Sequence, residues 1–146
     1  MRVVVAGGAG FLGSHLCDAL IDRGDQVVCV DSFTTGSKRN VAHLSGTSGF
    51  ELIEADVTTT DAFAIAGPID AVMNLASPAS PKDYLAMPLA TLAVGSDGTR
   101  NLLELACRHD ATFFMASTSE VYGDPLVHPQ TEDYWGHVNP IGERSV

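Results

Sequence analysis

The amino-acid sequence predicts an α/β protein built on a doubly wound parallel sheet. Short β-branched runs alternate with longer segments of helical periodicity over residues 1–117, and such alternation is typical of βαβ units. The 146 residues are 45% hydrophobic and 18% charged, which indicates one packed globular domain and excludes disorder for most of the chain. We therefore expect the element order βαβαβαβαβ.

The predicted strands are short and rich in β-branched or apolar residues. They lie at residues 2–6, 27–30, 50–53, 69–75 and 112–117. Each is short enough to be buried on both faces of a parallel sheet. Helical spacing of apolar residues predicts one helix from Phe11 to about Arg23, ending at Gly24, and another from about Leu89 to His109. Gly95 and Gly98 weaken the second helix.

Residues 118–146 have no periodicity, because prolines and glycines interrupt them throughout. These are Pro125, Pro129, Pro140, Gly123, Gly136 and Gly142. An irregular segment of this length is either a functional loop or a segment that needs further structure around it. We predict a boundary at residue 117 between the sheet core and this loop region.

Charge and composition exclude several kinds of partner. Eight basic and 18 acidic residues leave a formal net charge of −10, the wrong sign for binding nucleic acid. The apolar run at residues 3–6 is too short for a signal sequence or a membrane span, so we expect a cytoplasmic protein with no membrane partner. Cys17, Cys29 and Cys107 have no metal-ligand spacing, which favours small buried core residues and no metal.

A glycine-rich turn follows the first predicted strand. The run Gly7-Gly8-Ala9-Gly10-Phe11-Leu12-Gly13 fits both GxxGxxG and GxGxxG and opens directly into the first helix. Glycines let the backbone approach a pyrophosphate, and the helix N-terminus offers unpaired N–H groups with a partial positive charge. We predict a Rossmann-type dinucleotide site with contacts at Gly7, Gly10, Phe11, Leu12 and Gly13. A turn that only packs the helix on the sheet is the alternative.

Asp31 ends the second predicted strand, 21 residues beyond Gly10. A carboxylate there accepts hydrogen bonds from adenosine ribose hydroxyls and repels a 2′-phosphate. The sequence therefore predicts NAD rather than NADP, although the nearby cations Lys38 and Arg39 could attract a 2′-phosphate and leave NADP as the alternative. Asp56-Val57 follows the third strand, where an adenine ring would lie, and a turn-capping role for this aspartate is equally open.

Two further segments leave the carboxyl ends of predicted strands. Leu75-Ala76-Ser77 has small side chains that would let the nicotinamide half of a dinucleotide pass close to the sheet, and residues 117–123 follow the fifth strand. We expect the two segments to face one site. The simpler alternatives are loop stiffening at Pro78 and Pro81 and local backbone capping by Thr118 and Ser119.

These motifs together resemble the extended short-chain dehydrogenase/reductase family. The resemblance rests on residues 7–13, Asp31, Asp56-Val57 and Val121-Tyr122-Gly123. Residues 75–81, 116–125 and 132–142 resemble more narrowly the members that decarboxylate UDP-glucuronate. The resemblance implies that residues 1–117 bind NAD. Its further cofactor contacts would be Ser32, Phe33, Thr35 and Gly36.

The resemblance also implies a reaction. NAD would oxidise C4 of the sugar, the resulting 4-keto intermediate would lose CO2 from C5, and return of the hydride would give UDP-xylose. Thr118 would hydrogen-bond the 4-hydroxyl, and Glu120 would act as an acid or a base. Ser119-Glu120 stands where related dehydratases usually have Asp-Glu, which favours the decarboxylase. The alternatives are a nucleotide-sugar 4-epimerase, a 4,6-dehydratase or a non-catalytic NAD-binding module.

The chain departs from the family pattern at several positions. Asn74 stands where the family usually has His, Lys82 replaces a common Pro, and Val94-Gly95 replaces a Thr-Asn pair. No tyrosine begins the family's Tyr-x-x-x-Lys motif, whose place in the family directly follows that of Val146. We therefore expect residues 118–146 to lead toward that catalytic helix, the C-terminal strands and substrate domain to be absent, and this chain alone to be inactive.

Family members usually form homodimers through the helix predicted at residues 89–109. Its apolar side chains would form either that interface or the face packed on the sheet, and the periodicity leaves both open. They are Leu92, Leu102, Leu103, Leu105 and Ala106.

Overall fold

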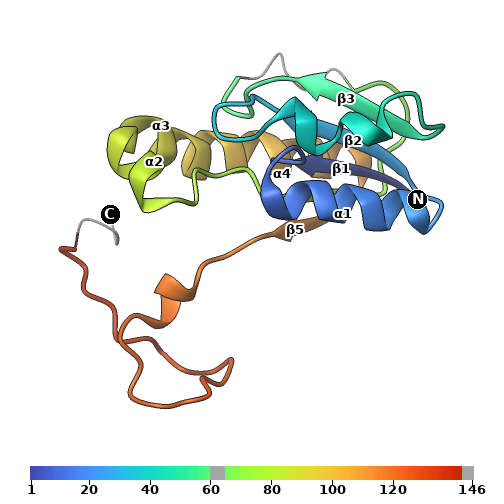
Figure 1. Ribbon diagram of the computed structural model, residues 1–146. Coiled ribbons are helices and arrows are strands. Elements are labelled where there is room, and N and C mark those ends of the chain that lie inside the picture. Colours follow the sequence, from blue (N-terminus) through green and yellow to red (C-terminus); the bar gives the residue numbers. More distant parts are fainter. Residues whose placement is uncertain (60–64, 143–146) are drawn as a thin grey trace. The chain divides into compact units, whose positions relative to one another are not determined.

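The computed structural model describes residues 1–59 and 65–142 and confirms the parallel sheet. The strands are β1 (Arg2–Ala6), β2 (Gln26–Asp31), β3 (Phe50–Glu54), β4 (Ala71–Asn74) and β5 (Thr112–Met115). Their order is β3-β2-β1-β4-β5, and every neighbouring pair is parallel (Figure 1). The order reverses between β1 and β4, which is where doubly wound sheets bind ligands.

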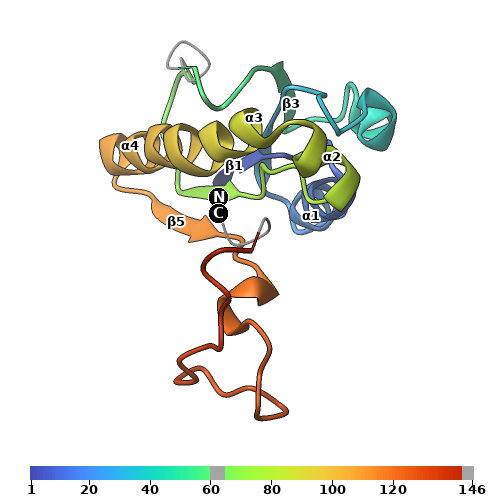
Figure 2. The ribbon, with the colours of Figure 1, turned by 90° about the vertical axis from the view of Figure 1, so that its left-hand side faces the viewer.

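The two predicted helices are both present. The helix α1 (Phe11–Asp22) follows β1, and α2 (Pro81–Ala86), α3 (Pro88–Ala93) and α4 (Thr99–His109) lie between β4 and β5. A π turn, η4 (Val94–Gly98), joins α3 to α4 (Figure 2). The helix predicted at residues 89–109 is therefore continuous but has one wide turn, which contains its two glycines.

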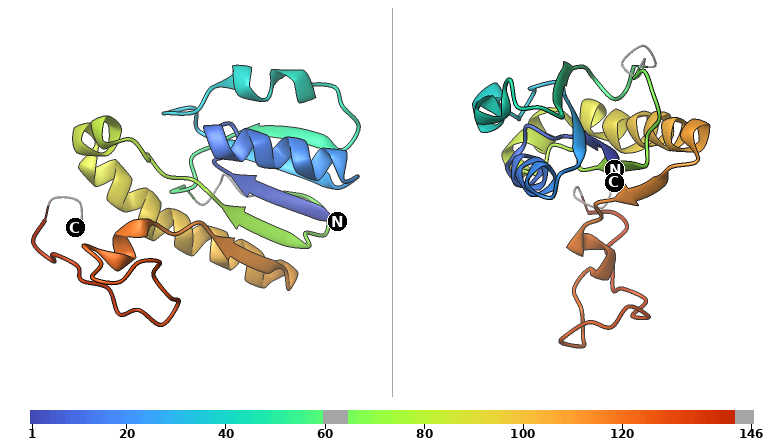
Figure 3. Two further views of the ribbon diagram at one scale, coloured as in Figure 1. Left: turned by 60° about the horizontal axis from the view of Figure 1, so that its bottom comes forward. Right: turned by 90° about the vertical axis from the view of Figure 1, so that its right-hand side faces the viewer.

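Helices α1 and α4 cover opposite faces of the sheet (Figure 3). Successive side chains of a strand point to opposite faces. Val4 therefore belongs to the core under α4 with Leu102 and Leu105, whereas Val3 belongs to the core under α1 with Leu20. The central strands are thus buried on both sides.

The burial of α4 decides which of its apolar side chains pack on the sheet. Leu102, Leu105 and Ala106 are at most 3% exposed and belong to the core. Leu103, also on α4, is 41% exposed, and Leu92 on α3 is 59% exposed. The apolar residues of the helix predicted at residues 89–109 therefore divide between a sheet-packed face and an outer face.

The sheet differs from the prediction at its edges. The edge strands β3 and β5 each have one neighbouring strand, and Leu52 and Phe114 are 40% and 48% exposed. The expectation that all strands are buried on both faces is wrong here, because an edge strand has less cover than a central one. The fourth and fifth strands also end earlier than predicted, at Asn74 and Met115.

The alternation of strands and helices is also less regular than predicted. Two short 3₁₀ turns, η1 (Lys38–Asn40) and η2 (Ala42–Leu44), stand where a helix was expected between β2 and β3. Polar residues dominate this stretch, and Val41 and Leu44 are its buried side chains. The connection from β3 to β4 includes residues 60–64, so the helix expected there lies partly outside the described residues.

The cysteines follow the prediction in two cases of three. Cys17 and Cys29 are buried, but Cys107 is exposed. Cys107 directly follows the buried Ala106 on α4, and one residue along a helix rotates the side chain by about 100°. That rotation places the third thiol on the outer face, so its prediction as a core residue is wrong.

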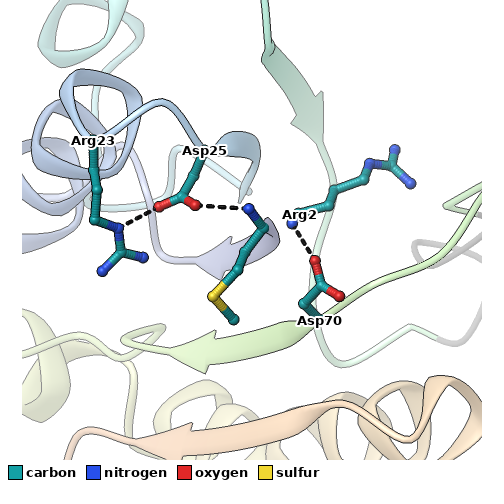
Figure 4. A network of polar contacts seen from close by, with 5 residues as sticks. Arg2, Arg23, Asp25 and Asp70 are labelled. Carbon is teal, nitrogen blue, oxygen red and sulfur yellow. Dashed lines mark hydrogen bonds and ion pairs between the residues drawn. The ribbon is translucent and has the colours of Figure 1, made fainter.

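A polar network holds the amino-terminal end of β1 (Figure 4). The Met1 ammonium donates to Asp25 Oδ1 at 2.8 Å, and Arg23 Nε donates to Asp25 Oδ2 at 2.6 Å. These two donors lower the pKa of the Asp25 carboxyl, the ammonium more than the guanidinium. The backbone N–H of Arg2 donates to Asp70 Oδ2 at 2.6 Å. The network lies at the end of the sheet opposite the glycine-rich turn.

The chain divides into two compact units, Met1–Met115 and Ala116–Val146. The second has a 3₁₀ turn, η5 (Ser119–Tyr122), and a short bridge between Gly123 and His137. The His137 N–H donates to the Tyr122 carbonyl at 2.9 Å, and the Asp124 N–H donates to the His137 carbonyl at 2.9 Å. Residues 143–146 of the predicted loop region lie outside the described residues.

Two further properties concern the described residues alone. Within residues 1–59 and 65–142, every helix is too short or too polar to cross a lipid bilayer. The same part of the chain holds no group of three or more His, Cys, Asp or Glu side chains placed to bind a metal ion.

Candidate functional site

Gly7 and Gly13 of the glycine-rich turn pack too closely against their neighbours to carry a side chain. Gly7 has φ +75°, and a Cβ there would lie 2.7 Å from the Leu75 carbonyl carbon. A Cβ on Gly13 would lie 2.7 Å from Gly8 Cα. The Gly7 N–H donates to the Val30 carbonyl at 2.8 Å. The turn is thus held between β2 and β4, at the point where the strand order reverses.

The Asp31 carboxylate connects the end of β2 to this turn. It is 8% exposed, and its Oδ2 accepts the Ala9 N–H at 2.9 Å while Oδ1 accepts the Phe33 N–H at 2.8 Å. A Cβ on Gly36 would lie 2.8 Å from Asp31 Oδ1, so the loop after β2 also approaches the carboxylate closely. Each carboxylate oxygen has a further lone pair for a ligand hydroxyl.

The Lys38 side chain forms an ion pair with Glu54, the last residue of β3. Its Nζ lies 2.6 Å from Glu54 Oε2 and 5.0 Å from the centroid of the Phe33 ring. Phe33 has φ +57°, a conformation in which a bulky side chain is rare. One of the two nearby cations, Lys38, is therefore paired with a carboxylate of this chain.

The turn after β3 combines a cap with a close approach to α4. Asp56 Oδ1 accepts both the N–H and the hydroxyl of Thr58, each at 2.8 Å, so the capping role left open from the sequence is present. Val57 is 5% exposed, and its carbonyl accepts the Asn101 amide at 2.9 Å.

The turn after β4 is held by Asn74. The Leu75 N–H donates to the Ala6 carbonyl at 2.9 Å, and Asn74 Oδ1 accepts the Ala76 N–H at 3.1 Å. Since Leu75 also meets Gly7, this turn and the glycine-rich turn form adjoining walls.

These turns line one cleft at the carboxyl ends of the strands, the position at which open α/β sheets bind their ligands. The predicted residues that line it are Gly7, Gly10, Asp31, Ser32, Thr35, Gly36, Asp56, Val57, Leu75, Ala76 and Ser77. Phe11, Leu12, Gly13 and Phe33 are not among its lining residues. Phe11 and Leu12 are 76% and 67% exposed, whereas Gly13 is buried beneath the turn.

One wall of the cleft was missed by sequence reasoning. Met87, Ala90, Ala93 and Val94 line it from α3 and its two ends. Their spacing of three or four residues was a usable signal, but the same spacing also fits packing on the sheet. The other unpredicted lining residues are Val30, Thr34, Ala55, Thr58 and Pro78.

The two predicted catalytic residues lie in the second unit. Thr118 is exposed, and its Oγ1 accepts the Glu120 N–H at 3.2 Å, which caps η5. Thr118 thus caps the backbone, as the simpler alternative expects, and its hydroxyl proton stays available to a ligand. That these residues face the same site as Leu75-Ala76-Ser77 stays a prediction.

Comparison with known proteins identifies the family of this chain. The model of the NAD dependent epimerase/dehydratase family matches residues 3–143. The chain belongs to this family. Among solved structures of epimerases and dehydratases, a UDP-galactose 4-epimerase has a TM-score of 0.81 and 33% identity over 94% of this chain and 45% of its own. A dTDP-glucose 4,6-dehydratase from Streptomyces venezuelae, solved with NAD bound, has a TM-score of 0.84 and 27% identity over 95% of this chain and 46% of its own.

Curated relatives resemble this chain more closely in sequence. UDP-glucuronic acid decarboxylase 1 of Arabidopsis thaliana is 54% identical over 99% of this chain and 32% of its own length. The protein of the same name from Danio rerio is 54% identical over 99% of this chain and 34% of its own length. The chain thus spans about a third of these relatives, and the predicted family and fold are both confirmed.

Proposed function

We propose that this chain binds NAD in the cleft and forms the cofactor-binding part of a UDP-glucuronate decarboxylase. The observation that carries the proposal is the buried Asp31 carboxylate, which faces the cleft beside a glycine-rich turn whose Gly7 and Gly13 leave no room for a Cβ. The residues present fit a dinucleotide, since a pyrophosphate needs close backbone approach and a ribose needs a carboxylate acceptor. The identity of 54% to decarboxylases supports the choice of reaction.

Each part of the cofactor has residues suited to hold it. Gly7, Gly10 and the N–H groups at residues 11–13 suit the pyrophosphate, because no side chain caps this helix start. Asp31 and residues 32–36 suit the adenosine ribose, and Asp56-Val57 suits the adenine ring. Leu75-Ala76-Ser77 suits the nicotinamide half, since it lies on the other side of β1 in the sheet order.

The same geometry supports NAD over NADP. A 2′-phosphate would meet the Asp31 carboxylate, and Lys38 is already paired with Glu54 at 2.6 Å. Displacing that pair would leave the Glu54 carboxylate facing a second anion. We therefore expect titration calorimetry to show binding of NAD and at least tenfold weaker binding of NADP, a difference of about 1.4 kcal/mol. Equal affinity for the two would contradict the proposal.

Bound NAD would supply an acceptor, and later a donor, of hydride at C4 of the sugar. Thr118 would donate a hydrogen bond to the reacting 4-oxygen while its Oγ1 accepts the Glu120 N–H. The 4-hydroxyl proton would go to the Tyr of the family's Tyr-x-x-x-Lys motif, which this chain does not contain. Once C4 is a ketone, it lies β to the C5 carboxylate, so the carbonyl accepts the electron pair left when CO2 departs. Glu120 would then supply the proton that C5 requires, since a carboxyl is a suitable general acid.

A chimera tests the reaction. This chain replaces the matching segment of the Arabidopsis thaliana decarboxylase, to which it is 54% identical. The chimeric protein is then supplied with UDP-glucuronate. We expect release of CO2 and formation of UDP-xylose. The chain by itself should bind NAD and release no CO2, because it has no Tyr-x-x-x-Lys base.

The same experiment separates the alternatives. An epimerised or dehydrated nucleotide sugar, with no CO2, would establish the 4-epimerase or the 4,6-dehydratase, whose solved members share the fold at 33% and 27% identity. A folded chimera that retains NAD but converts no nucleotide sugar would establish the non-catalytic module.

We also propose a homodimer formed through the outer face of α3 and α4. Leu89, Leu92 and Leu103 are 81%, 59% and 41% exposed on these helices. Apolar side chains in such a row favour burial against a second copy of the same surface. Sedimentation of the wild-type chain at increasing concentration should show a dimer, and Leu92→Lys should shift the equilibrium toward the monomer.

A further inference from the structure

Two buried asparagines join the start of α4 to the two turns that wall the cleft. Asn74 is 2% exposed and Asn101 is 5% exposed. We propose that they are positioning residues for the two halves of the bound dinucleotide, Asn74 for the nicotinamide half and Asn101 for the adenine half. This inference rests on the proposed binding of NAD. It adds two residues that do not themselves line the cleft.

Asn74 uses both ends of its amide. Its Oδ1 accepts the Ala76 N–H at 3.1 Å, and its Nδ2 donates to Thr99 Oγ1 at 3.2 Å and to Met115 Sδ at 3.3 Å. Ala76 lines the cleft, whereas Thr99 begins α4 and Met115 ends β5. The side chain thus ties the turn after β4 to two neighbouring elements.

Asn101 makes the equivalent connection on the other side. Its Nδ2 donates to the Val57 carbonyl at 2.9 Å across 44 residues of sequence. One turn earlier, Gly98 is packed so closely that a Cβ would lie 2.7 Å from Val57 Cγ2. A hydrogen bond and a close packing contact therefore set the distance between α4 and the Asp56-Val57 turn.

The sheet order separates the two effects. Val57 follows β3 and Ala76 follows β4, and these strands lie on opposite sides of β1, which carries the glycine-rich turn. A dinucleotide whose pyrophosphate rests on that turn extends one half toward each side. Loss of one asparagine should therefore affect one half of the ligand and spare the other.

The residue type matters because the amide is both a donor and an acceptor. Leucine has a similar volume and neither function, so Asn74→Leu releases the Ala76 N–H, and Asn101→Leu releases the Val57 carbonyl. Histidine, the residue usual in the family at position 74, also offers one donor and one acceptor when neutral. Asn74→His is therefore the conservative variant expected to restore binding.

The experiment titrates the full chain and its variants with NAD and with ADP-ribose, which lacks the nicotinamide. Asn74→Leu should weaken NAD binding about tenfold and ADP-ribose binding less than about twofold, with Asn74→His close to wild type. Asn101→Leu should weaken both ligands by the same factor of about ten. Near-UV circular dichroism and urea unfolding establish that each variant is folded.

A core variant supplies the matched control. Leu105→Ala lies on the same helix at 0% exposure and belongs to the sheet-packed core, so it should lower stability and leave both affinities unchanged. Wild-type affinities for both ligands from the asparagine variants, or equal losses from both variants and from Leu105→Ala, would overturn the positioning roles alone. Wild-type binding of ADP-ribose as tight as that of NAD would overturn the role given to Asn74. No binding of either ligand to folded wild type would overturn the proposed function as well.

Discussion

The Asp31 carboxylate accepts the backbone N–H of Ala9 at 2.9 Å and so fastens the end of β2 to the middle of the glycine-rich turn. The residue expected to hold the ligand's ribose is therefore also a structural residue of the turn. A ligand that binds this carboxylate binds a group already fixed in place, because Phe33 donates to its other oxygen at 2.8 Å.

The structural role of Asp31 and its proposed role in ligand binding together predict a double effect of its substitution. Asp31→Asn keeps the shape but replaces one acceptor oxygen by an amide donor, which faces either the Ala9 N–H or the Phe33 N–H. We expect urea unfolding to show a loss of about 1–3 kcal/mol, the penalty for a buried group left unpaired, together with weaker NAD binding by calorimetry. Unchanged stability would show that the turn does not depend on this carboxylate.

Two glycines with positive φ separate backbone strain from close packing. Gly7 has φ +75°, and a Cβ at this position would lie against the Leu75 backbone. Gly24 has φ +88°, and a Cβ there would have nothing within 4 Å. Gly24→Ala should cost about 1–2 kcal/mol from conformation alone and leave NAD binding intact. Gly7→Ala should cost more in urea unfolding and abolish NAD binding. Equal effects of the two would remove the argument from close approach.

Neighbouring leucines of α4 test its two faces. Leu102 is 0% exposed against the sheet and Leu103 is 41% exposed. Leu102→Ala should lower the free energy of unfolding by about 2–5 kcal/mol through the cavity it leaves. Leu103→Ala should change the stability of the monomer by less than about 0.5 kcal/mol and weaken self-association in sedimentation. The reverse order of stabilities would contradict the division of the helix into two faces.

The network at the amino-terminal end of β1 predicts a pH dependence. The pKa of Asp25 is lowered from its ordinary 3.8, chiefly by the hydrogen bond from the Met1 ammonium and then by Arg23. Because the folded pKa lies below the unfolded one, this contribution to stability is complete above pH 3.8 and is lost as pH falls through the folded value.

Substitution of Asp25 tests that dependence. Asp25→Asn should lower the thermal midpoint at pH 7, and the difference from wild type should shrink at pH 3 and below. Asp97→Asn, at an exposed carboxylate paired with Arg100 at 2.8 Å, is the matched control and should change stability by less than about 0.5 kcal/mol. A difference from wild type that stays constant between pH 7 and pH 3 would contradict the role of the ionised carboxylate.

Several features of the fold were predictable because their signals are local. β-branched runs and helical spacing placed the strands and the two long helices within a few residues of their observed bounds. The glycine-rich turn was predictable because turn, strand and helix start all lie within residues 2–13. The edge strands and the exposed Cys107 were not, because burial depends on what the rest of the chain places against a residue.

The cleft shows the same division between local and long-range information. Its floor, formed by the turns after β1, β2, β3 and β4, followed from the rule that ligands bind at the carboxyl ends of parallel strands. Its helical wall at Met87 and Ala90 could not be predicted from the sequence, because it depends on where α3 lies in the folded chain. The pairing of Lys38 with Glu54 and the hydrogen bonds donated by the Asn74 and Asn101 amides join residues 16 to 44 positions apart, so no local pattern predicts them.

The order of residues was thus sufficient for the strand and helix pattern, the glycine-rich turn, the acidic residue at the end of the second strand and the family resemblance. Folding in three dimensions decided which leucines of α4 face the sheet, that Lys38 is paired with a carboxylate, and that two asparagines tie α4 to the cleft. The reason is physical: backbone conformation responds to neighbouring residues, whereas burial and hydrogen-bond partners depend on segments that the fold alone brings together.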